Sequence, residues 1–280
     1  VFLVVAGMLV AAVVRAKRDP DRSLDRREIG WGEPFIAVAG VFLPFVILAG
    51  VYVFSLQEMN ELANRGKGAA TNIEVIAHNW WWEVRYENSA VSANEIHIPT
   101  GRPIRLELTS ADVIHSFWVP ELQVKTDHIP GRTNHMWLQA DEPGRYRGQC
   151  AEYCGLQHAN MIFYVIAHEP QEFERWLAHE VEPAGLPEEA EAQAGAAIFM
   201  ESSCAGCHAV RGTQAAANLG PDLTHFSTRT TIAGVLPNAR SNLHLFVRDP
   251  HGIKPGVAMP PTELDADELD AVLDYLEALD

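Results

Sequence analysis

Apolar residues are concentrated in two stretches near the start of the chain. Residues 1–14 and residues 34–56 contain no charged side chain. The second stretch is 23 residues long, enough to cross a bilayer as a tilted helix, whereas the first is too short to cross alone. We therefore expect residues 1–56 to form a transmembrane hairpin whose first helix is incomplete at its N-terminal end. A signal peptide for the first stretch and a buried core helix for the second are the alternatives.

Beyond these stretches the hydrophobic pattern changes to a period of two. Residues 103–108 alternate between apolar and polar side chains, as on a half-buried strand. Similar short runs recur at 72–77, 133–139 and 161–167. Pro-Gly pairs that favour turns stand at 130–131 and 143–144. Many short strands joined by turns predict an antiparallel β sandwich or barrel over residues 71–168.

The last third of the chain has a helical pattern. Residues 169–187 are predicted to form a helix that runs into a linker rich in Glu, Pro and Ala. A further helix is predicted over residues 192–200, directly before a cysteine-containing segment. Residues 188–280 are therefore assigned to a separate domain.

Charge is distributed unevenly along the chain, whose formal net charge is −16. Residues 1–30 contain six basic and four acidic residues, which leaves 15 basic and 33 acidic residues for the remainder. The basic residues between 15 and 27 predict, by the positive-inside rule, a cytoplasmic loop in a multi-pass protein of a bacterial cell membrane. The domains after residue 56 would then lie on the periplasmic or outer face. Their acidity argues against nucleic acid and suits either a basic protein partner or simple solubility.

The four cysteines form two close pairs, each next to a histidine, which indicates metal or haem chemistry rather than a disulfide scaffold. The first pair is Cys150 and Cys154, followed by His158 and Met161. Thiolate and thioether ligands favour copper, and imidazole suits it too. His115, which follows a predicted strand, is the best candidate for a second imidazole. A zinc site or a disulfide is the alternative, but this spacing is not typical of structural zinc.

The second pair belongs to a Cys-x-x-Cys-His motif at 204–208, the attachment signal for a c-type haem. Cys204 and Cys207 would add to the haem vinyl groups, and His208 would become an axial ligand of the iron. Met259 is the expected second axial ligand, because Met200 precedes the motif on a helix and is expected to pack in the core. A thioredoxin-like redox pair is the alternative, but it would need a βαβ context.

Three segments of the predicted β domain closely resemble subunit II of the haem–copper cytochrome c oxidases. They are residues 115–117, 125–132 and 150–161. The resemblance implies a cupredoxin barrel with a dinuclear copper centre, CuA, at 71–168. The C-terminal domain resembles a small class I cytochrome c, matching at 220–223 and in a final helix over 265–279, which implies an all-helical fold for this domain. The order of membrane helices, CuA domain and cytochrome domain is that of the caa3-type oxidases.

The resemblance also implies a ligand set for the copper centre. Cys150 and Cys154 would bridge the two coppers, and the remaining ligands would be His115, His158, Met161 and the carbonyl of Glu152. The Glu152 side chain would face a magnesium ion at the boundary with subunit I.

Two further residues take roles from the family pattern. Trp80 would be the point at which electrons enter CuA; an aromatic belt or core packing is the alternative. Glu28, three residues before Trp31, would form the cytoplasmic mouth of a proton channel into subunit I. For Glu28 the alternative is an ordinary interfacial carboxylate, and the spacing to Pro34 is one residue shorter than usual.

The function that these features predict is electron transfer within a proton-pumping oxidase. Electrons would pass from a donor, either a soluble cytochrome c or another respiratory complex, to haem c, to CuA and to haem a of subunit I. Oxygen would be reduced in subunit I, and subunit III and membrane lipid are further expected partners. A quinol oxidase subunit is disfavoured by the copper-ligand residues. A stand-alone membrane-tethered carrier remains the third hypothesis.

Overall fold

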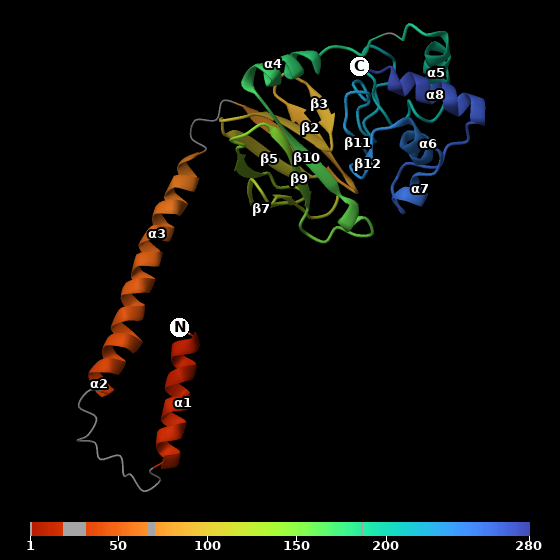
Figure 1. The fold of residues 1–280 in the computed structure, drawn as a ribbon. Coiled ribbons are helices and arrows are strands. Elements are labelled where there is room, and N and C mark those ends of the chain that lie inside the picture. The colour runs from red at the N-terminus through yellow and green to blue at the C-terminus, as the bar shows by residue number, and fades with distance from the viewer. Residues whose placement is uncertain (1, 19–31, 66–70, 186) are drawn as a thin grey trace. The chain divides into compact units, whose positions relative to one another are not determined.

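The computed structural model describes residues 2–18, 32–65, 71–185 and 187–280. The chain divides into two compact units, residues 1–63 and 64–280 (Figure 1). Each unit is described by itself below. The bounds predicted for the domains, including 169–187 for the helix and linker, remain predictions.

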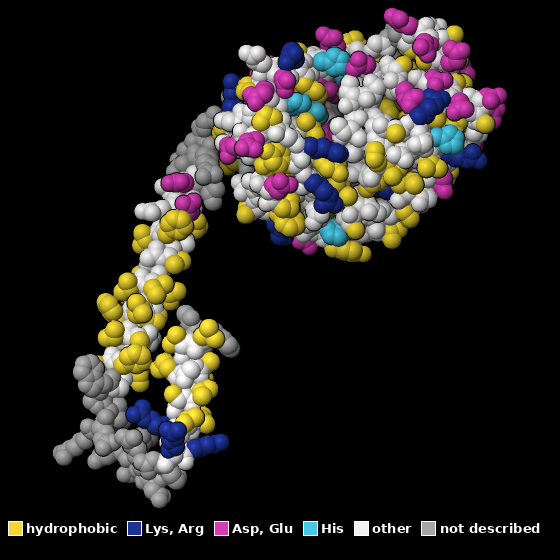
Figure 2. Space-filling view, in the orientation of Figure 1, with side chains coloured by type: hydrophobic (Ala, Val, Ile, Leu, Met, Phe, Trp, Pro, Cys, Tyr) yellow, Lys and Arg dark blue, Asp and Glu magenta, His cyan; other side chains and the backbone are white. Residues whose placement is uncertain are grey.

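The first unit is helical. It contains α1 (Phe2–Arg18), α2 (Gly32–Phe35), a π-helical segment (Ile36–Phe42) and α3 (Leu43–Arg65). Among the described residues one helix is long and apolar enough to cross a membrane, Ile36–Glu61, with a mean hydropathy of 2.5. Its large apolar side chains are exposed, and Figure 2 shows them along the helix. The predicted loop lies largely within residues 19–31, so Glu28 falls outside the described residues.

Two five-stranded sheets form a cupredoxin-like sandwich at the start of the second unit. The strands of one sheet are, in spatial order, β3 (Val91–Ala93), β2 (Trp81–Tyr86), β1 (Asn72–His78), β5 (Ile104–Ser110) and β8 (Asn134–Leu138). Those of the other are β4 (Glu95–Pro99), β10 (Ile162–His168), β9 (Gly144–Cys150), β6 (His115–Val119) and β7 (Gln123–His128).

The predicted sandwich is confirmed, but its sheets are not wholly antiparallel. β1 pairs with β5, and β4 with β10, in parallel. Alternation of apolar and polar side chains reports one buried face and carries no information on strand direction. Both parallel pairs join strands that are distant in sequence, as parallel pairing requires.

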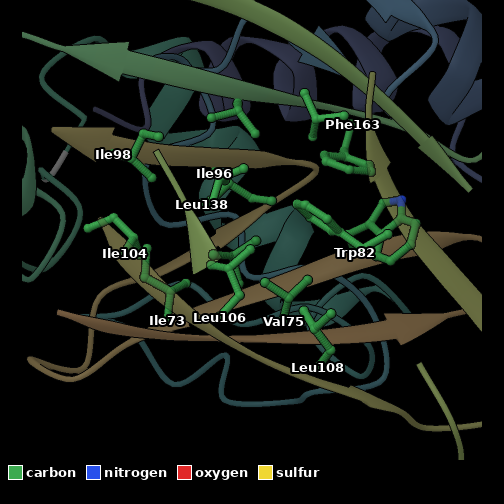
Figure 3. Packing of buried hydrophobic residues seen from close by; sticks show 14 of the residues in the cluster. Ile73, Val75, Trp82, Ile96, Ile98, Ile104, Leu106, Leu108, Leu138 and Phe163 are labelled. Carbon is green, nitrogen blue, oxygen red and sulfur yellow. The ribbon is translucent and has the colours of Figure 1, made fainter. Parts of the chain in front are cut away.

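The sandwich core is formed by the inward-facing positions of both sheets. Along β5 every second residue is buried, which places Ile104, Leu106 and Leu108 in the core. Trp82 and Phe163 pack edge to face, with ring centroids 5.0 Å apart, and Figure 3 shows them among the aliphatic side chains. A rigid, fully buried core of this kind fixes the strand ends and loops that carry the functional residues.

The remainder of the second unit is mainly helical. Its helices are α4 (Pro170–His179), α5 (Ala190–Glu201), α6 (Arg240–Arg248), α7 (Pro250–Ile253) and α8 (Ala266–Glu277). α8 begins with a capping box, in which Asp265 and Glu268 each accept a hydrogen bond from the other's backbone N–H. The expected all-helical cytochrome fold is confirmed, with one addition: a two-residue ladder of β11 (Thr231–Ile232) and β12 (Leu236–Pro237).

Candidate functional site

Two free thiols lie close together at the end of β9. Cys150 is the last residue of that strand, and its N–H donates to the carbonyl of Met161 at 3.0 Å. The chain then turns back, so that the Cys154 Sγ lies 3.8 Å from the Cys150 Sγ. Both cysteines are buried and neither forms a disulfide. The disulfide alternative therefore does not apply to this pair.

Each thiol has its own imidazole neighbour. The Nδ1 atom of His115 lies 3.9 Å from the Cys150 Sγ, and the Nδ1 atom of His158 lies 3.7 Å from the Cys154 Sγ. Two donors on one metal ion are about 3.6 Å apart when each metal–ligand bond is about 2.2 Å long. The donor spacing, with one histidine at either end of a thiol pair, therefore suits two metal ions that share the sulfur atoms.

Two weaker donors complete the cluster. The Met161 Sδ lies 3.8 Å from the Cys154 Sγ, and the Cys150 thiol donates to the Glu152 carbonyl at 3.1 Å. The structure thus brings together all six residues predicted around the copper centre. The Glu152 carboxylate instead lies at the surface, 3.7 Å from the Lys125 Nζ.

The electrostatics of the thiol pair favour a metal ion. The contact with the Cys154 thiol lowers the pKa of Cys150, with help from His115 and against the effect of burial. The same contact, together with burial, raises the pKa of Cys154. A metal ion binds sulfur as thiolate, so the lowered pKa of Cys150 favours metal binding, and binding to both sulfur atoms releases any proton held on Cys154.

Asp112 is a functional residue that the sequence reasoning missed. Its Oδ1 atom lies 2.7 Å from the Nε2 of His115, and its Oδ2 accepts a hydrogen bond from the Asn79 backbone N–H at 2.6 Å. A metal-binding histidine usually donates its other ring N–H to a carboxylate, which fixes the orientation of the ring. An acid three residues before a candidate ligand is the signal that could have identified Asp112.

The structure distinguishes the three consecutive tryptophans that the sequence presents as a group. The Trp80 Nε1–H donates to the carbonyl of Cys154 at 3.0 Å, so this indole touches the thiol loop directly. Trp81 stacks on His78 with centroids 4.4 Å apart. Trp82 is fully buried in the sandwich core. The Trp80 indole therefore contacts the thiol loop, and the Trp82 ring packs edge to face with that of His115, with centroids 6.2 Å apart.

A cavity of about 600 Å³ lies at the Cys-x-x-Cys-His motif. Cys204, Cys207, His208 and Met259 all line it. The His208 Nδ1 is hydrogen-bonded to the Pro221 carbonyl at 2.7 Å, which leaves the Nε2 free for an iron atom. Met200, the rejected alternative for the second axial ligand, packs against the helical core.

The haem cavity is shaped by a close approach at His208. A Cβ atom on Gly220 would lie 2.7 Å from the Cε1 of this imidazole, so the ring fits only beside a glycine. The donor set and the space at the motif therefore fit a covalently held haem.

The haem cavity is also lined by the sandwich domain. Trp80 and Trp81 contribute to its wall, as does Arg229 from the helical domain. Trp80 therefore donates its indole N–H to the thiol loop and also lines the haem cavity.

Comparison with known proteins agrees with both halves of this description. Residues 89–168 match the family model for the periplasmic domain of cytochrome c oxidase subunit II, and residues 192–280 match the model for cytochrome c. The periplasmic domain of cytochrome oxidase subunit II from Bradyrhizobium japonicum is a similar solved structure, with 33% identity and a TM-score of 0.39. The alignment covers 40% of this chain and 94% of that one.

Two curated relatives extend the match beyond the separate domains. Cytochrome c oxidase subunit 2 of Alkalihalophilus pseudofirmus is 44% identical over 209 residues, which are 74% of this chain and 60% of that relative's length. The Bacillus subtilis protein of the same name is 31% identical over 268 residues, which cover 89% of this chain and 75% of that relative. The chain therefore belongs to the cytochrome c oxidase subunit 2 family, in the form that carries a fused cytochrome c domain.

Proposed function

We propose that this chain is the electron-accepting subunit of a caa3-type cytochrome c oxidase. Electrons pass from an external donor to haem c, then to CuA, and then to haem a of subunit I, where oxygen is reduced to water with proton pumping. The observation that carries the proposal is the position of Trp80, which touches the thiol loop and lines the haem cavity.

The copper centre is held by the six clustered donors. Cys150 and Cys154 would hold the two coppers together, His115 and His158 would each bind one of them, and Met161 and the Glu152 carbonyl would be weak ligands. A thiolate-bridged copper pair supplies one-electron redox chemistry. The chain's part is to hold the ligands still: Asp112 fixes the His115 ring, and the Cys150 backbone is tied into the ladder of β9.

The helical domain would hold the haem covalently through Cys204 and Cys207, with His208 and Met259 as the residues that would bind the iron. A haem bound in this way supplies a one-electron carrier, and methionine ligation raises its potential. The hydrogen bond between the His208 Nδ1 and the Pro221 carbonyl orients the imidazole.

Several parts of the proposal concern the rest of the complex. Subunits I and III and membrane lipid are the expected partners, and a soluble cytochrome c or another respiratory complex is the donor. The chain crosses the bacterial cell membrane more than once, with both redox domains on the outer face. Glu152 contributes to a magnesium site beside subunit I, and Glu28 contributes to proton uptake.

Metal and haem analysis of the purified complex tests the proposal. Expression of the full chain with its partner subunits should yield two coppers and one covalent haem per chain, and EPR should show one unpaired electron shared by both coppers. A single zinc in place of copper, or haem lost on denaturation, would contradict it. Purification without a haem-a-containing subunit would favour a stand-alone carrier.

A further inference from the structure

The β sandwich and the helical domain meet in a closely packed interface inside the second unit. A Cβ atom on Gly234 of the helical domain would lie only 2.4 Å from the carbonyl oxygen of Ile162 in β10. The Gln157 side chain, in the thiol loop, donates to the carbonyl of Pro255 at 2.8 Å. The loop that carries Met259 therefore contacts the loop that carries the thiols.

A buried carboxylate crosses this interface from the sandwich side. Glu95, the first residue of β4, is 1% exposed. Its Oε1 accepts hydrogen bonds from the backbone N–H groups of Thr230 and Thr231, at 2.9 and 3.1 Å, and from both hydroxyls. Burial raises the pKa of Glu95, but hydrogen bonds from His97 and Thr230 outweigh this effect and lower the pKa overall. Glu95 is therefore an anion that accepts hydrogen bonds from two threonines of the other domain.

A buried cation crosses the interface in the opposite direction. Lys254, which directly follows α7, is 2% exposed. Its Nζ donates to the backbone carbonyl of Trp80 at 2.8 Å and to that of Ala233 at 3.1 Å. An ammonium group removed from water needs such acceptors, because an unpaired buried charge is strongly unfavourable. Here one of the acceptors belongs to the tryptophan that touches the thiol loop.

The two contacts share one short segment. Residues 230–231 bind Glu95, and Ala233 of the same segment binds Lys254. Glu95 of the sandwich is thus bound by the helical domain, and Lys254 of the helical domain is bound by the sandwich.

We infer that Glu95 and Lys254 are positioning residues that together form a latch, which holds Trp80 against the haem cavity. The inference rests on the proposed haem-to-copper route and deepens it. The rate of electron tunnelling falls steeply with distance. A helical domain held in one position against the sandwich therefore transfers electrons faster than a domain that must first diffuse into that position.

The test uses the whole oxidase complex and the variants Glu95→Leu and Lys254→Met. After flash reduction of haem c, the rate of electron transfer to CuA should fall about tenfold or more in each variant. Because the two residues act on one pose, the double variant should be little slower than either single variant. Glu87→Gln and Arg175→Met change exposed residues of the same charge type and should leave the rate unchanged.

A second measurement separates the latch from a general loss of fold. Hydrogen–deuterium exchange should increase at residues 78–82 and 230–234 in the latch variants, while the CuA and haem spectra remain those of the wild type. If a charge deletion prevents assembly, Thr230→Val replaces it, since this near-isosteric change removes one hydroxyl donor to Glu95. It should also slow transfer and increase exchange.

The outcomes distinguish the latch from the route. Wild-type transfer rates and unchanged exchange in every assembled variant would overturn the latch and leave the route intact. Absence of haem-to-CuA transfer in the wild-type complex would instead overturn the proposed function.

Discussion

The indole N–H of Trp80 donates to the carbonyl oxygen of Cys154 at 3.0 Å, although the two residues are 74 positions apart in the sequence. The hydrogen bond ties the end of a hairpin turn to the middle of the thiol loop. Trp80→Phe keeps an aromatic ring but removes this N–H. We expect slower haem-to-CuA transfer with full copper and haem content, measured by flash reduction.

The matched control for this change is Trp137→Phe. Trp137 lies on β8 and is not among the residues that line the haem cavity. The Trp137 variant should transfer electrons at the wild-type rate. Equal rates in all three proteins would show that Trp80 is not on the path.

Asp112 supports the copper centre through His115. Asp112→Ala removes the carboxylate that lies 2.7 Å from the His115 Nε2. Loss of such a partner typically weakens metal binding by about 10–100-fold. Copper content after dialysis against a graded series of chelator concentrations measures the effect. Asp141→Ala, at an exposed loop position, is the control and should retain copper like the wild type.

The two methionines of the helical domain provide a matched pair for the haem. Met259 lines the haem cavity, whereas Met200 packs against the helical core. Met259→Leu should lower the midpoint potential of haem c, because methionine ligation raises it. Met200→Leu should leave the potential unchanged. A redox titration followed by haem absorbance measures the midpoint potential of each variant. A lower potential in Met200→Leu, with an unchanged potential in Met259→Leu, would identify Met200 as the axial ligand instead.

Glu180 makes the stability of the chain depend on pH. It is 4% exposed, and burial raises its pKa from 4.5 to about 7. The folded chain therefore binds a proton that the unfolded chain releases between these values. Its contribution to stability is complete below pH 4.5 and is lost as pH rises through 7, a difference of about 3 kcal/mol.

Glu180→Gln should remove this pH dependence and raise the unfolding midpoint at pH 8. Thermal unfolding of the purified full-length chain between pH 4.5 and 8 measures the change. Glu182→Gln, at an exposed neighbouring position, should behave as the wild type. An unchanged slope in Glu180→Gln would show that another group titrates.

The sequence predicted the parts of the site whose spacing is local. Cys150, Cys154 and His158 fall within nine residues, and the haem motif within five, so donor chemistry and spacing identify both. The roles of Glu95 and Lys254 could not be predicted from the sequence, because their hydrogen-bond partners lie 135 and 174 positions away. Nothing near either residue in the sequence indicates that a second domain will cover it.

The tryptophans illustrate the same limit within a single segment. Residues 80–82 are chemically identical side chains, and only the fold gives each a different environment. Strand direction was equally hidden, because alternation records which face is buried and not how neighbouring strands run.

The close contact of Gly234 with the Ile162 carbonyl has a consequence for the distance between the redox centres. A side chain at this position would begin 2.4 Å from that oxygen, and relief of the clash would push the two domains about 1 Å apart. The absence of a side chain at Gly234 therefore keeps the two domains close together, and with them the two ends of the proposed haem-to-CuA route. Almost any larger residue at position 234 would increase the distance across which the electron tunnels. It would do so without changing a ligand of the copper or the haem, or Trp80 itself.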